Sequence, residues 1–358
     1  MGYAAARGGL TAIHAAERLV RRLRDDDPSD PLDTDQFTGR LRLLVDRVMG
    51  EAGLWAPQVA AAALRQAEGD VIEAVHLLRA YKSTLPRLAV SGVVHANDLK
   101  AVRRVVPAFR EPGGPQMLGR STDYTARMLE NTVTLPADDA QDVAGTQDVI
   151  SGPPVMDRMT DVLRRMDLLV DRRRTDDPEP FDITRTPARP PAPRSALLSS
   201  MARAETGALI GQWYRNILGP DGYLHEVTLG EVRHGSLPVH VTHPVTGGTV
   251  TVGSFRATEV EAIEDLNGID EDRTRFDAGY GMCLGHNERK AIAMANLDIA
   301  CSRDGARSPL EQSVLLTTDG LDSAGFLEHL KLPHYVTFRS MIERKIAVRR
   351  ATDASGAE

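Results

Sequence analysis

Two histidines near the C-terminus, His329 and His334, have the spacing and setting of a metal-binding pair. They lie in the segment HLKLPHYV, where Pro333 stiffens the chain and disfavours a regular helix through both imidazoles. Two neutral imidazoles on one rigid loop can bind Zn²⁺ or another late first-row ion, provided that further ligands come from elsewhere. The alternative is that both are ordinary surface or hydrogen-bonded histidines.

A glycine-bearing segment before a helical pattern is a candidate anion site. Gly279-Tyr280-Gly281 and then Gly285 precede Asn287-Glu288-Arg289-Lys290, where a helix is expected to begin. Backbone N–H groups at such a turn can hold a phosphate. The spacing matches neither the G-x-x-x-x-G-K-[ST] loop nor the G-x-G-x-x-G fingerprint, so a plain strand-to-helix turn is the alternative.

Arginine is concentrated in the middle of the chain. Guanidinium groups suit bidentate contact with phosphate or carboxylate, so the cluster is a second indication of an anionic ligand. A solvated helix face followed by a basic linker is the alternative interpretation. The residues concerned are Arg158, Arg164, Arg165, Arg172, Arg173, Arg174, Arg185, Arg189 and Arg194.

The two cysteines, Cys283 and Cys301, are too few for a disulfide framework and do not form a paired metal motif. We expect both to be reduced thiols in or near the core. The sequence has no G-x-S-x-G elbow, no Cys-His nucleophile signature and no H-E-x-x-H motif. Motifs alone therefore indicate an α+β protein with a phosphate site and no further chemistry.

Composition excludes several classes of protein. The formal charge of -7 argues against generic nucleic-acid binding, which depends on an excess of Lys and Arg. No stretch approaches the roughly 18 apolar residues of a membrane-spanning helix, and the start MGYAAARGG is unlike a signal peptide. We therefore expect a cytoplasmic protein. Its 358 residues predict about two domains or one large elaborated one.

The first third of the chain is predicted to be a helical bundle, because apolar residues recur there at helical spacing. Thr34 and Asp70 are suitable N-terminal caps, and Pro57 suits a first helical turn. The four predicted helical segments are Ala12–Leu23, Phe37–Met49, Val59–Ala67 and Val71–Leu85.

The middle of the chain is predicted to be more irregular. Residues 95–120 indicate a strand followed by a turn, and helical segments are expected near 121–133 and 156–171. Between these helices, the acidic stretch 136–154, which contains proline and glycine, is predicted to be a mobile loop. Residues 176–195 are rich in proline and are predicted to form an extended strap between the two halves.

Strands are predicted from about Leu224 to Glu264, with a hairpin turn at Gly247-Gly248. Beyond them we expect an extended piece ending at Gly279-Tyr280-Gly281, a helix from Glu288 to Cys301, a strand at Ser313–Thr318 and a helical C-terminal tail. The fold class is therefore α+β, a helical bundle followed by a mixed half with a small antiparallel sheet. The predicted division is 1–95 helical bundle, 96–175 strand plus helices, 176–195 strap, 196–350 α+β domain and 351–358 disordered tail.

Several sequence blocks resemble, in order and nearly from end to end, the PhnI family. Members of that family are subunits of the bacterial carbon-phosphorus lyase core complex, which breaks down phosphonates. DITRTP and HLKLPHYV are the most specific blocks, because neither has a generic structural explanation. The blocks are YAAARGG, LVDRVMGEAG, LLRAY, DYTARML, DITRTPARPP, GYGMCLGHNERKAIAMA and AGFLEHLKLPHYV.

The resemblance implies a ribosyl-transfer step. The family is linked to displacement of adenine from ATP by a phosphonate, giving ribose 1-phosphonate 5-triphosphate, and to nucleosidase activity on purine nucleoside triphosphates when the subunit acts alone. Breaking the N-glycosidic bond passes through an oxocarbenium-like state, as glycoside hydrolysis does. The protein must then place negative charge near the ribose, assist departure of the base and hold the triphosphate.

Candidate residues exist for each of these tasks. Asp182 and Glu288 can supply a carboxylate, and with Arg185 they form the candidate catalytic set. His329 and His334 match the family's metal-binding pair at a subunit interface, and Zn²⁺ is the expected ion. Candidate phosphate-binding residues are Arg185, Arg194, Gly279, Tyr280, Gly281, Arg289 and Lys290.

The resemblance also implies partners, namely PhnG, PhnH and PhnJ homologues in a core complex. ATP, with Mg²⁺, and an alkylphosphonate are the expected substrates, and no Fe-S or S-adenosylmethionine site is expected in this chain. The competing interpretation is a structural subunit whose active site forms only with these partners. A stand-alone metal-dependent hydrolase is disfavoured, because HLKLPHYV supplies only two of the ligands that such a site needs.

Two structural expectations follow. Arg185 should reach from the proline-rich strap toward Gly279-Tyr280-Gly281 and complete a phosphate site, the alternative being an ion pair with Asp182. The alanine-rich N-terminal helices and the strand region should leave apolar surface exposed in the isolated chain, because they offer more apolar face than the chain needs for its own core.

Overall fold

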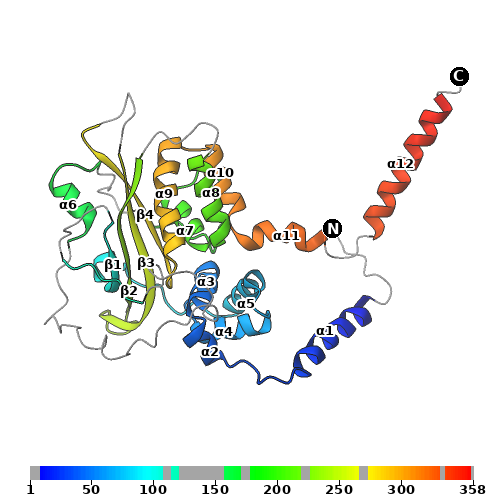
Figure 1. Cartoon of the computed structure of the whole chain (residues 1–358), viewed down its shortest axis with the longest axis horizontal. Coiled ribbons are helices and arrows are strands. Elements are labelled where there is room, and N and C mark those ends of the chain that lie inside the picture. Colours follow the sequence, from blue (N-terminus) through cyan, green and yellow to red (C-terminus); the bar gives the residue numbers. More distant parts are fainter. Residues whose placement is uncertain are drawn as a thin grey trace, which may run out of the picture.

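A computed structural model describes residues 9–107, 114–120, 157–170, 178–218, 226–265, 273–330 and 335–355. These residues form helices and one four-stranded antiparallel sheet, which confirms the predicted α+β class (Figure 1). The predicted mobile loop at 136–154 and the predicted helix at 121–133 lie outside the described residues.

The N-terminal helices form a bundle, as the apolar spacing predicted, but the first helix is not part of it. Helix α1 (Gly9–Asp25) has no buried residue and stands apart from the rest of the chain (Figure 1). The bundle has its own apolar core, which includes Phe37, Val48, Met49, Leu64 and Leu78. Its helices are α2 (Thr34–Arg40), α3 (Arg42–Ala52), α4 (Pro57–Gln66) and α5 (Val71–Ser83).

Local signals begin these helices largely as expected. Asp70 caps α5 by accepting the N–H of Glu73 at 3.1 Å, and Pro57 occupies the first turn of α4. The predicted N-cap of α2, Thr34, was wrong by one residue, because the side chain of Asp33 accepts the free N–H groups there. The Gln36 side chain bonds back to the N–H of Asp33 and completes a capping box.

The sheet runs in the order β1-β2-β3-β4, and every neighbouring pair is antiparallel. The predicted hairpin is confirmed, since β2 and β3 join through a turn in which Gly247 has a φ of 68°. A short 3-10 helix, η1 (Ala96–Asp98), precedes the first strand. The strands are β1 (Lys100–Val105), β2 (Glu226–Thr242), β3 (Thr249–Asp265) and β4 (Phe276–Leu284).

The two faces of the sheet differ. Four helices cover one face, and their core with the sheet includes Val260, Ala262, Met294 and Leu297 (Figure 1). Helix α6 (Met159–Arg165) lies against the other face, within the region predicted to be helical at 156–171. The four covering helices are α7 (Arg194–Arg203), α8 (Thr206–Leu218), α9 (Glu288–Asp304) and α10 (Pro309–Thr317).

Two further helices complete the chain. Helix α11 (Gly320–Leu330) follows α10, and helix α12 (Tyr335–Ser355) projects away from the body (Figure 1). The predicted helical tail is therefore confirmed. The predicted disordered tail at 351–358 was wrong in part, because α12 continues through Ser355.

The predicted strand at Ser313–Thr318 was wrong, because these residues belong mainly to helix α10. Ser308 caps this helix by accepting the N–H of Glu311 at 3.1 Å, and Pro309 occupies its first turn. A short apolar run is ambiguous between strand and helix by periodicity alone. The capping signal upstream decides in favour of the helix.

The predicted glycine turn at Gly279-Tyr280-Gly281 was also wrong, because these residues lie in the middle of β4. A Cβ atom at Gly279 would overlap the carbonyl oxygen of Ala295, and one at Gly281 would overlap that of Ala291. These glycines therefore let α9 pack directly on the strand. The turn itself lies further on, at Gly285, where φ is 74°.

Candidate active site

The face of the sheet opposite α7–α10 carries two rows of polar side chains. Strand register places Glu231, Glu261 and Tyr280 opposite one another across β2, β3 and β4. The neighbouring row joins Arg104, Arg233, Glu259 and Met282 across all four strands. Residues two apart on a strand share a face, so alternate positions build both rows while the intervening Val232, Val260 and Ala262 lie in the core.

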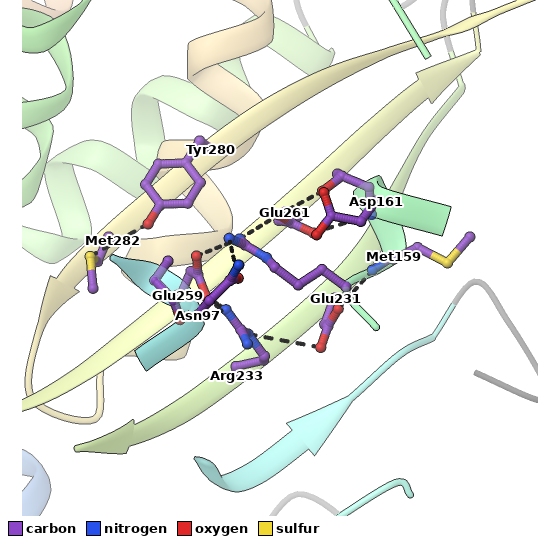
Figure 2. A network of polar contacts seen from close by, with 12 residues as sticks. Asn97, Met159, Asp161, Glu231, Arg233, Glu259, Glu261, Tyr280 and Met282 are labelled. Carbon is purple, nitrogen blue, oxygen red and sulfur yellow. Dashed lines mark hydrogen bonds and ion pairs between the residues drawn. The ribbon is translucent and has the colours of Figure 1, made fainter. Parts of the chain in front are cut away.

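Buried ion pairs hold these rows together. Arg104 donates to Glu231 at 2.7 Å, and the Nε atom of Arg233 donates to Glu259 at 2.9 Å. Figure 2 shows the wider network, in which Arg233 also lies 3.8 Å from Glu231. All four side chains are buried. Removing either partner of such a pair would leave the other charge buried without compensation. Each pair therefore keeps both of its side chains in position on the polar face of the sheet.

Two strand carboxylates also fix the start of α6. Glu231 accepts the N–H of Met159 at 3.0 Å, and Glu261 accepts the Thr160 hydroxyl at 2.8 Å and its N–H at 3.4 Å. Free N–H groups and a positive partial charge lie at that end of a helix, so buried carboxylates are well placed there. The sheet thereby sets the position of Arg158, the residue immediately before α6.

A cavity of about 360 Å³ lies between α6, the sheet and the start of α7. Its walls combine basic, acidic and aromatic side chains with a few apolar ones. They are Asn97, Arg158, Thr160, Asp161, Arg164, Leu169, Val170, Arg194, Glu261, Ala278, Gly279 and Tyr280.

Three arginines reach this cavity, each beside a carboxylate. Arg158 donates to Glu259 at 2.6 Å and pairs closely with Glu261, and its buried Nε atom has no hydrogen-bond partner. Arg164 pairs with Asp161 one turn away on α6. These pairs hold the guanidinium groups in place, and a phosphate-bearing ligand would bring oxygens of the same kind that they already bind.

Arg194 is the third arginine. It binds Asp298 of α9 through two hydrogen bonds, at 2.8 and 2.6 Å. Asp298 also accepts the N–H of Tyr280 at 2.9 Å, so one carboxylate ties the first residue of α7 to the middle of β4. About half of the Arg194 side chain remains exposed, with a relative accessibility of 53%.

Burial shifts the pKa values of both Glu261 and Tyr280 upward. Burial raises the pKa of Glu261, an effect that Arg158 opposes and the neighbouring Glu259 reinforces. Burial also raises the pKa of Tyr280, whose hydroxyl donates to the Met282 sulfur at 3.5 Å (Figure 2). The cavity thus holds a buried carboxyl group whose pKa is raised by burial and which is paired with the fixed positive charge of Arg158.

The structure brings together three of the predicted phosphate-binding residues. Arg194, Gly279 and Tyr280 all line the cavity. The residue of the strap that reaches the glycine-bearing strand is Arg194, not Arg185 as expected. Arg185 is absent from the cavity walls.

The strap residues Asp182 and Arg185 pair with each other instead, at 3.5 Å, which is the structural alternative. Asp182 also binds Arg87 at 3.1 Å and accepts the N–H of Thr184 at 2.9 Å. Hydrogen bonds from Thr184 and then Arg87 lower the pKa of Asp182 to about 2. In this arrangement Asp182 closes a turn of the strap and does not face the cavity.

Glu288 and its neighbours lie elsewhere. Glu288 binds Arg103 closely and His286 at 3.3 Å. Burial alone would raise the pKa of Glu288, but bonds from His286 and Arg103 lower it to about 2. Arg289 is exposed on α9, whereas Lys290 is fully buried and its Nζ atom has no hydrogen-bond partner. Lys290 is therefore not available to clamp a surface phosphate.

The predicted metal pair is not tested by the structure. The backbone of His329 lies near the end of α11, while its side chain and all of His334 lie outside the described residues. Among the described residues, no group of three or more His, Cys, Asp or Glu side chains could hold a metal ion. Both cysteines are free and buried, as predicted.

Sequence reasoning missed the residues that build the cavity wall from the sheet. Glu259 and Glu261 lie in a region that was predicted to form strands, and no site residue was assigned there. The available signal was the spacing of Glu231 with Arg233 and of Glu259 with Glu261, since charges at alternate positions share one face of a strand. Such charges on a buried strand demand partners and mark either a buried network or a site.

Comparison with known proteins gives the family. The profile described as "Bacterial phosphonate metabolism protein (PhnI)" matches residues 2–352. The chain belongs to the PhnI family. In the described part of this PhnI-family chain, no helix is long and apolar enough to cross a membrane.

Three curated relatives match the chain over nearly its whole length. A putative C-P lyase subunit protein, HtxH, from Stutzerimonas stutzeri is 42% identical, covering 96% of this chain and 95% of its own. A protein named alpha-D-ribose 1-methylphosphonate 5-triphosphate synthase subunit PhnI, from Rhizobium meliloti (strain 1021), is 36% identical and covers 99% and 97% of the two chains. The protein of the same name from Escherichia coli (strain K12) is 36% identical and covers 95% and 96%.

Proposed function

We propose that this chain takes part in displacing adenine from ATP by a phosphonate, and that the arginine-lined cavity holds the sugar and phosphate groups during that step. The names of two relatives give the reaction product, a ribose 1-methylphosphonate 5-triphosphate. The observation that carries the proposal is the meeting of Arg158, Arg164 and Arg194 with the protonatable Glu261 in one cavity.

The roles follow from the chemistry of the side chains. The C1'–N9 bond of ATP breaks, a C1'–O bond to the phosphonate forms, and adenine leaves with a proton. Glu261 supplies that proton as a general acid, because burial shifts its pKa upward and so favours the protonated form. Arg164 and Arg194 hold phosphate or phosphonate oxygens, and Asp161 accepts hydrogen bonds from ribose hydroxyls. When water replaces the phosphonate, the same cavity supports nucleosidase activity.

The zinc pair stays part of the proposal, supported by the resemblance of HLKLPHYV to the family. His329 and His334 would hold Zn²⁺ at a subunit interface, where the ion would supply Lewis-acid chemistry. Metal analysis of the purified complex tests this, with His334→Ala expected to lower bound zinc. Equal zinc content in the variant and the wild type would contradict it.

A second candidate function is that of a mainly structural subunit, whose active site forms only with PhnG, PhnH and PhnJ homologues. The exposure of every described residue of α1 beyond Gly9 favours it, because a helix without packing of its own suggests a role in assembly. The cavity does not exclude this role.

Measurement of adenine release distinguishes the catalytic function from the structural one. The purified chain, alone and with the three partner subunits, is incubated with ATP, with and without methylphosphonate, and free adenine is measured by chromatography. The catalytic proposal predicts release that falls in Glu261→Gln. If Glu261→Gln releases adenine at the wild-type rate in every combination, the cavity has no catalytic role. If only the assembled complex is active and this variant inactivates it, the cavity acts within the assembly.

A further inference from the structure

We propose that the junction between the helical bundle and the sheet holds a second anion site, which binds a phosphate-type dianion through Arg42, Arg120 and Arg256. This site is separate from the cavity, and the inference does not rest on the proposed function. The two lie on opposite faces of the sheet. Alternation along β3 separates them, because Arg256 has the same parity as Val260 of the core, and Glu261 of the cavity has the other.

A hydrogen bond between Arg42 and His286 joins the bundle to the loop before α9. Arg42 is the first residue of α3, and it donates to Nδ1 of His286 at 2.8 Å, since a guanidinium group has no acceptor. The ring proton of His286 is therefore on Nε2, which lies 3.3 Å from Glu288. His286 is neutral in this arrangement. It holds the guanidinium group of Arg42 in place without cancelling its charge.

Arg256 reaches the same junction from β3. Its guanidinium group lies over the ring of Trp55, 5.4 Å from the centroid, and donates to Asp46 of α3 at 3.2 Å. The other carboxylate oxygen of Asp46, which is fully buried, accepts the backbone N–H of His286 at 3.0 Å. One carboxylate thus fixes both Arg256 and the loop of His286. The Arg256 side chain remains 40% exposed, which leaves it accessible to a small ligand.

Arg120 comes from a segment that lies beside β1. Arg103 of β1 donates to the carbonyl oxygen of Leu118 at 2.7 Å and so anchors that segment. In the antiparallel ladder Arg103 pairs with His234, whose ring stacks on His286 with the centroids 4.3 Å apart. Arg120 is exposed at the end of this segment. Three separate parts of the chain therefore bring their arginines to one place.

Positive charge exceeds negative charge there. Burial lowers the pKa of Arg42, and the charges of Arg120 and Arg256 lower it further, against the opposing effect of Asp46. In the described part of the chain, neither Arg42 nor Arg120 forms an ion pair with a carboxylate. Three guanidinium groups against the single carboxylate of Asp46 leave a net charge of +2.

The other groups packed around this site do not cancel that charge. Glu288 pairs closely with Arg103. Burial lowers the pKa of His234 to about 4, so this imidazole is neutral near pH 7. The first turn of α3 contains no acidic residue, and Leu41 at its N-cap has no side-chain hydrogen bond to offer. The positive end of the α3 dipole therefore adds to the same field.

The number of donors and the charge favour a phosphate-type dianion over a carboxylate. A phosphate monoester carries roughly 1.5 to 2 negative charges near pH 7 and has three acceptor oxygens, which suits three guanidinium groups. Inorganic phosphate, a phosphonate and the terminal phosphate of a nucleotide share this chemistry. Because Arg42 belongs to the bundle and Arg256 to the sheet, a bound dianion would also bridge the two and stabilise the folded chain.

Equilibrium dialysis of the full-length chain against radiolabelled inorganic phosphate, at fixed ionic strength, tests the site. Arg42→Gln and Arg120→Gln should each weaken phosphate binding by about tenfold, because a hydrogen bond to a charged group is lost. Arg42→Lys should recover only part of the affinity, since an ammonium group lacks the guanidinium fork. Arg215→Gln, on an exposed position of α8, is the matched control and should bind like the wild type.

Thermal unfolding shows that the variants fold. Without phosphate, Arg120→Gln should unfold at the wild-type temperature, because Arg120 is exposed and forms no ion pair in the described part of the chain. Phosphate should raise the unfolding temperature of the wild type and of Arg215→Gln, and should raise that of Arg42→Gln and Arg120→Gln much less. An equal rise in all four proteins would contradict the site.

Arg164→Gln separates this site from the cavity, and it should leave the binding that depends on Arg42 unchanged. If Arg164→Gln loses phosphate while Arg42→Gln and Arg120→Gln keep wild-type affinity, phosphate binds in the cavity alone and the proposal is overturned. Absence of saturable binding to the wild type would also overturn it.

Competition against labelled phosphate identifies the source of the dianion. Displacement by unlabelled methylphosphonate or by ATP at a lower concentration than by phosphate itself would support the site and assign it to a phosphonate or to a nucleotide. Displacement by phosphate alone would support it as a site for inorganic phosphate. Acetate should compete poorly, and competition by acetate as strong as that by phosphate would overturn the assignment to a phosphate-type dianion.

Discussion

Glu261 of β3 lies directly opposite Tyr280 of β4, and both residues line the arginine-bearing cavity. Strand register alone brings them together, since the two positions are paired in the antiparallel ladder. Burial favours the neutral form of each, while Arg158 beside Glu261 keeps a positive charge at the same wall. This pairing is the basis of the proposed general acid.

Glu261→Gln should lower the rate of adenine release from ATP by about 100-fold or more, because it removes the proton donor. A general acid works in its protonated form, so wild-type activity should fall as the pH rises through the raised pKa of Glu261. The variant should lack that part of the pH profile. Chromatographic assays over a range of pH measure this, with Glu343→Gln on exposed α12 as the control. An unchanged pH profile in the Gln variant would refute the role.

Arg164→Gln should raise the KM for ATP by about tenfold, because a charge-assisted contact to a phosphate oxygen is lost. Arg185→Gln is the matched control, since Arg185 is exposed on the strap and paired with Asp182. It should leave the KM unchanged. If Arg185→Gln weakens ATP binding and Arg164→Gln does not, the phosphate site lies at the strap and not in the cavity.

Glu231→Leu should lower the free energy of unfolding by about 3–5 kcal/mol, because it leaves the buried Arg104 without its carboxylate. The double variant Arg104→Met, Glu231→Leu should recover at least half of that loss, since no buried charge then stands alone. Urea denaturation measures both. Equal stability of the single and double variants would show that the pair does not act as a unit.

Gly279→Ala should lower the free energy of unfolding by about 1–3 kcal/mol, because the added methyl group would overlap the carbonyl oxygen of Ala295. Gly253→Ala in β3 is the matched control, because a methyl group at Gly253 would have no other atom within 4 Å and the backbone φ there is not positive. It should change stability by less than about 0.5 kcal/mol. Similar values for the two would contradict the close packing of α9 on β4.

Lys290→Met should raise the free energy of unfolding by about 1–3 kcal/mol near neutral pH, because it removes a buried amine without a hydrogen bond. Burial lowers the pKa of Lys290 below its unfolded value of 10.5, so the unfolded chain binds more protons between the two values. The contribution of Lys290 to the free energy of unfolding of the wild type therefore rises with pH between its folded and unfolded pKa values.

The advantage of Lys290→Met over the wild type should accordingly shrink as the pH increases from about 7 toward 10. Urea denaturation of both proteins at several pH values measures it. An advantage that grows with pH would show that Lys290 is charged and paired in the folded protein.

Residue patterns predicted much of the fold. Apolar spacing located the bundle, although the single helix predicted at Phe37–Met49 is two helices, α2 and α3, that meet at Leu41. Gly247-Gly248 located the hairpin turn. The strand at Ser313–Thr318 failed because a run of six residues fits both a strand and a helix. The prediction of a glycine turn failed because Gly279 and Gly281 allow β4 to pack closely on α9, a helix that comes later in the chain. No local pattern reveals such a contact.

The candidate site was predicted only in part. Arg194 was predicted to bind phosphate and lines the cavity. Gly279 and Tyr280 also line it, but they were predicted as part of a turn before a helix, whereas they lie within β4. Arg158 belonged to a cluster that was noted without assigning its partners. Glu261 was missed, because its role depends on register across β3 and β4 and on the burial that raises its pKa.

The most direct test of the cavity as a substrate site is a structure of the chain, alone or with its partner subunits, bound to ATP. The account predicts phosphate oxygens between Arg164 and Arg194, with the ribose near Glu261 and Asp161. A nucleotide bound elsewhere, with the cavity free of ligand at saturating ATP, would contradict it.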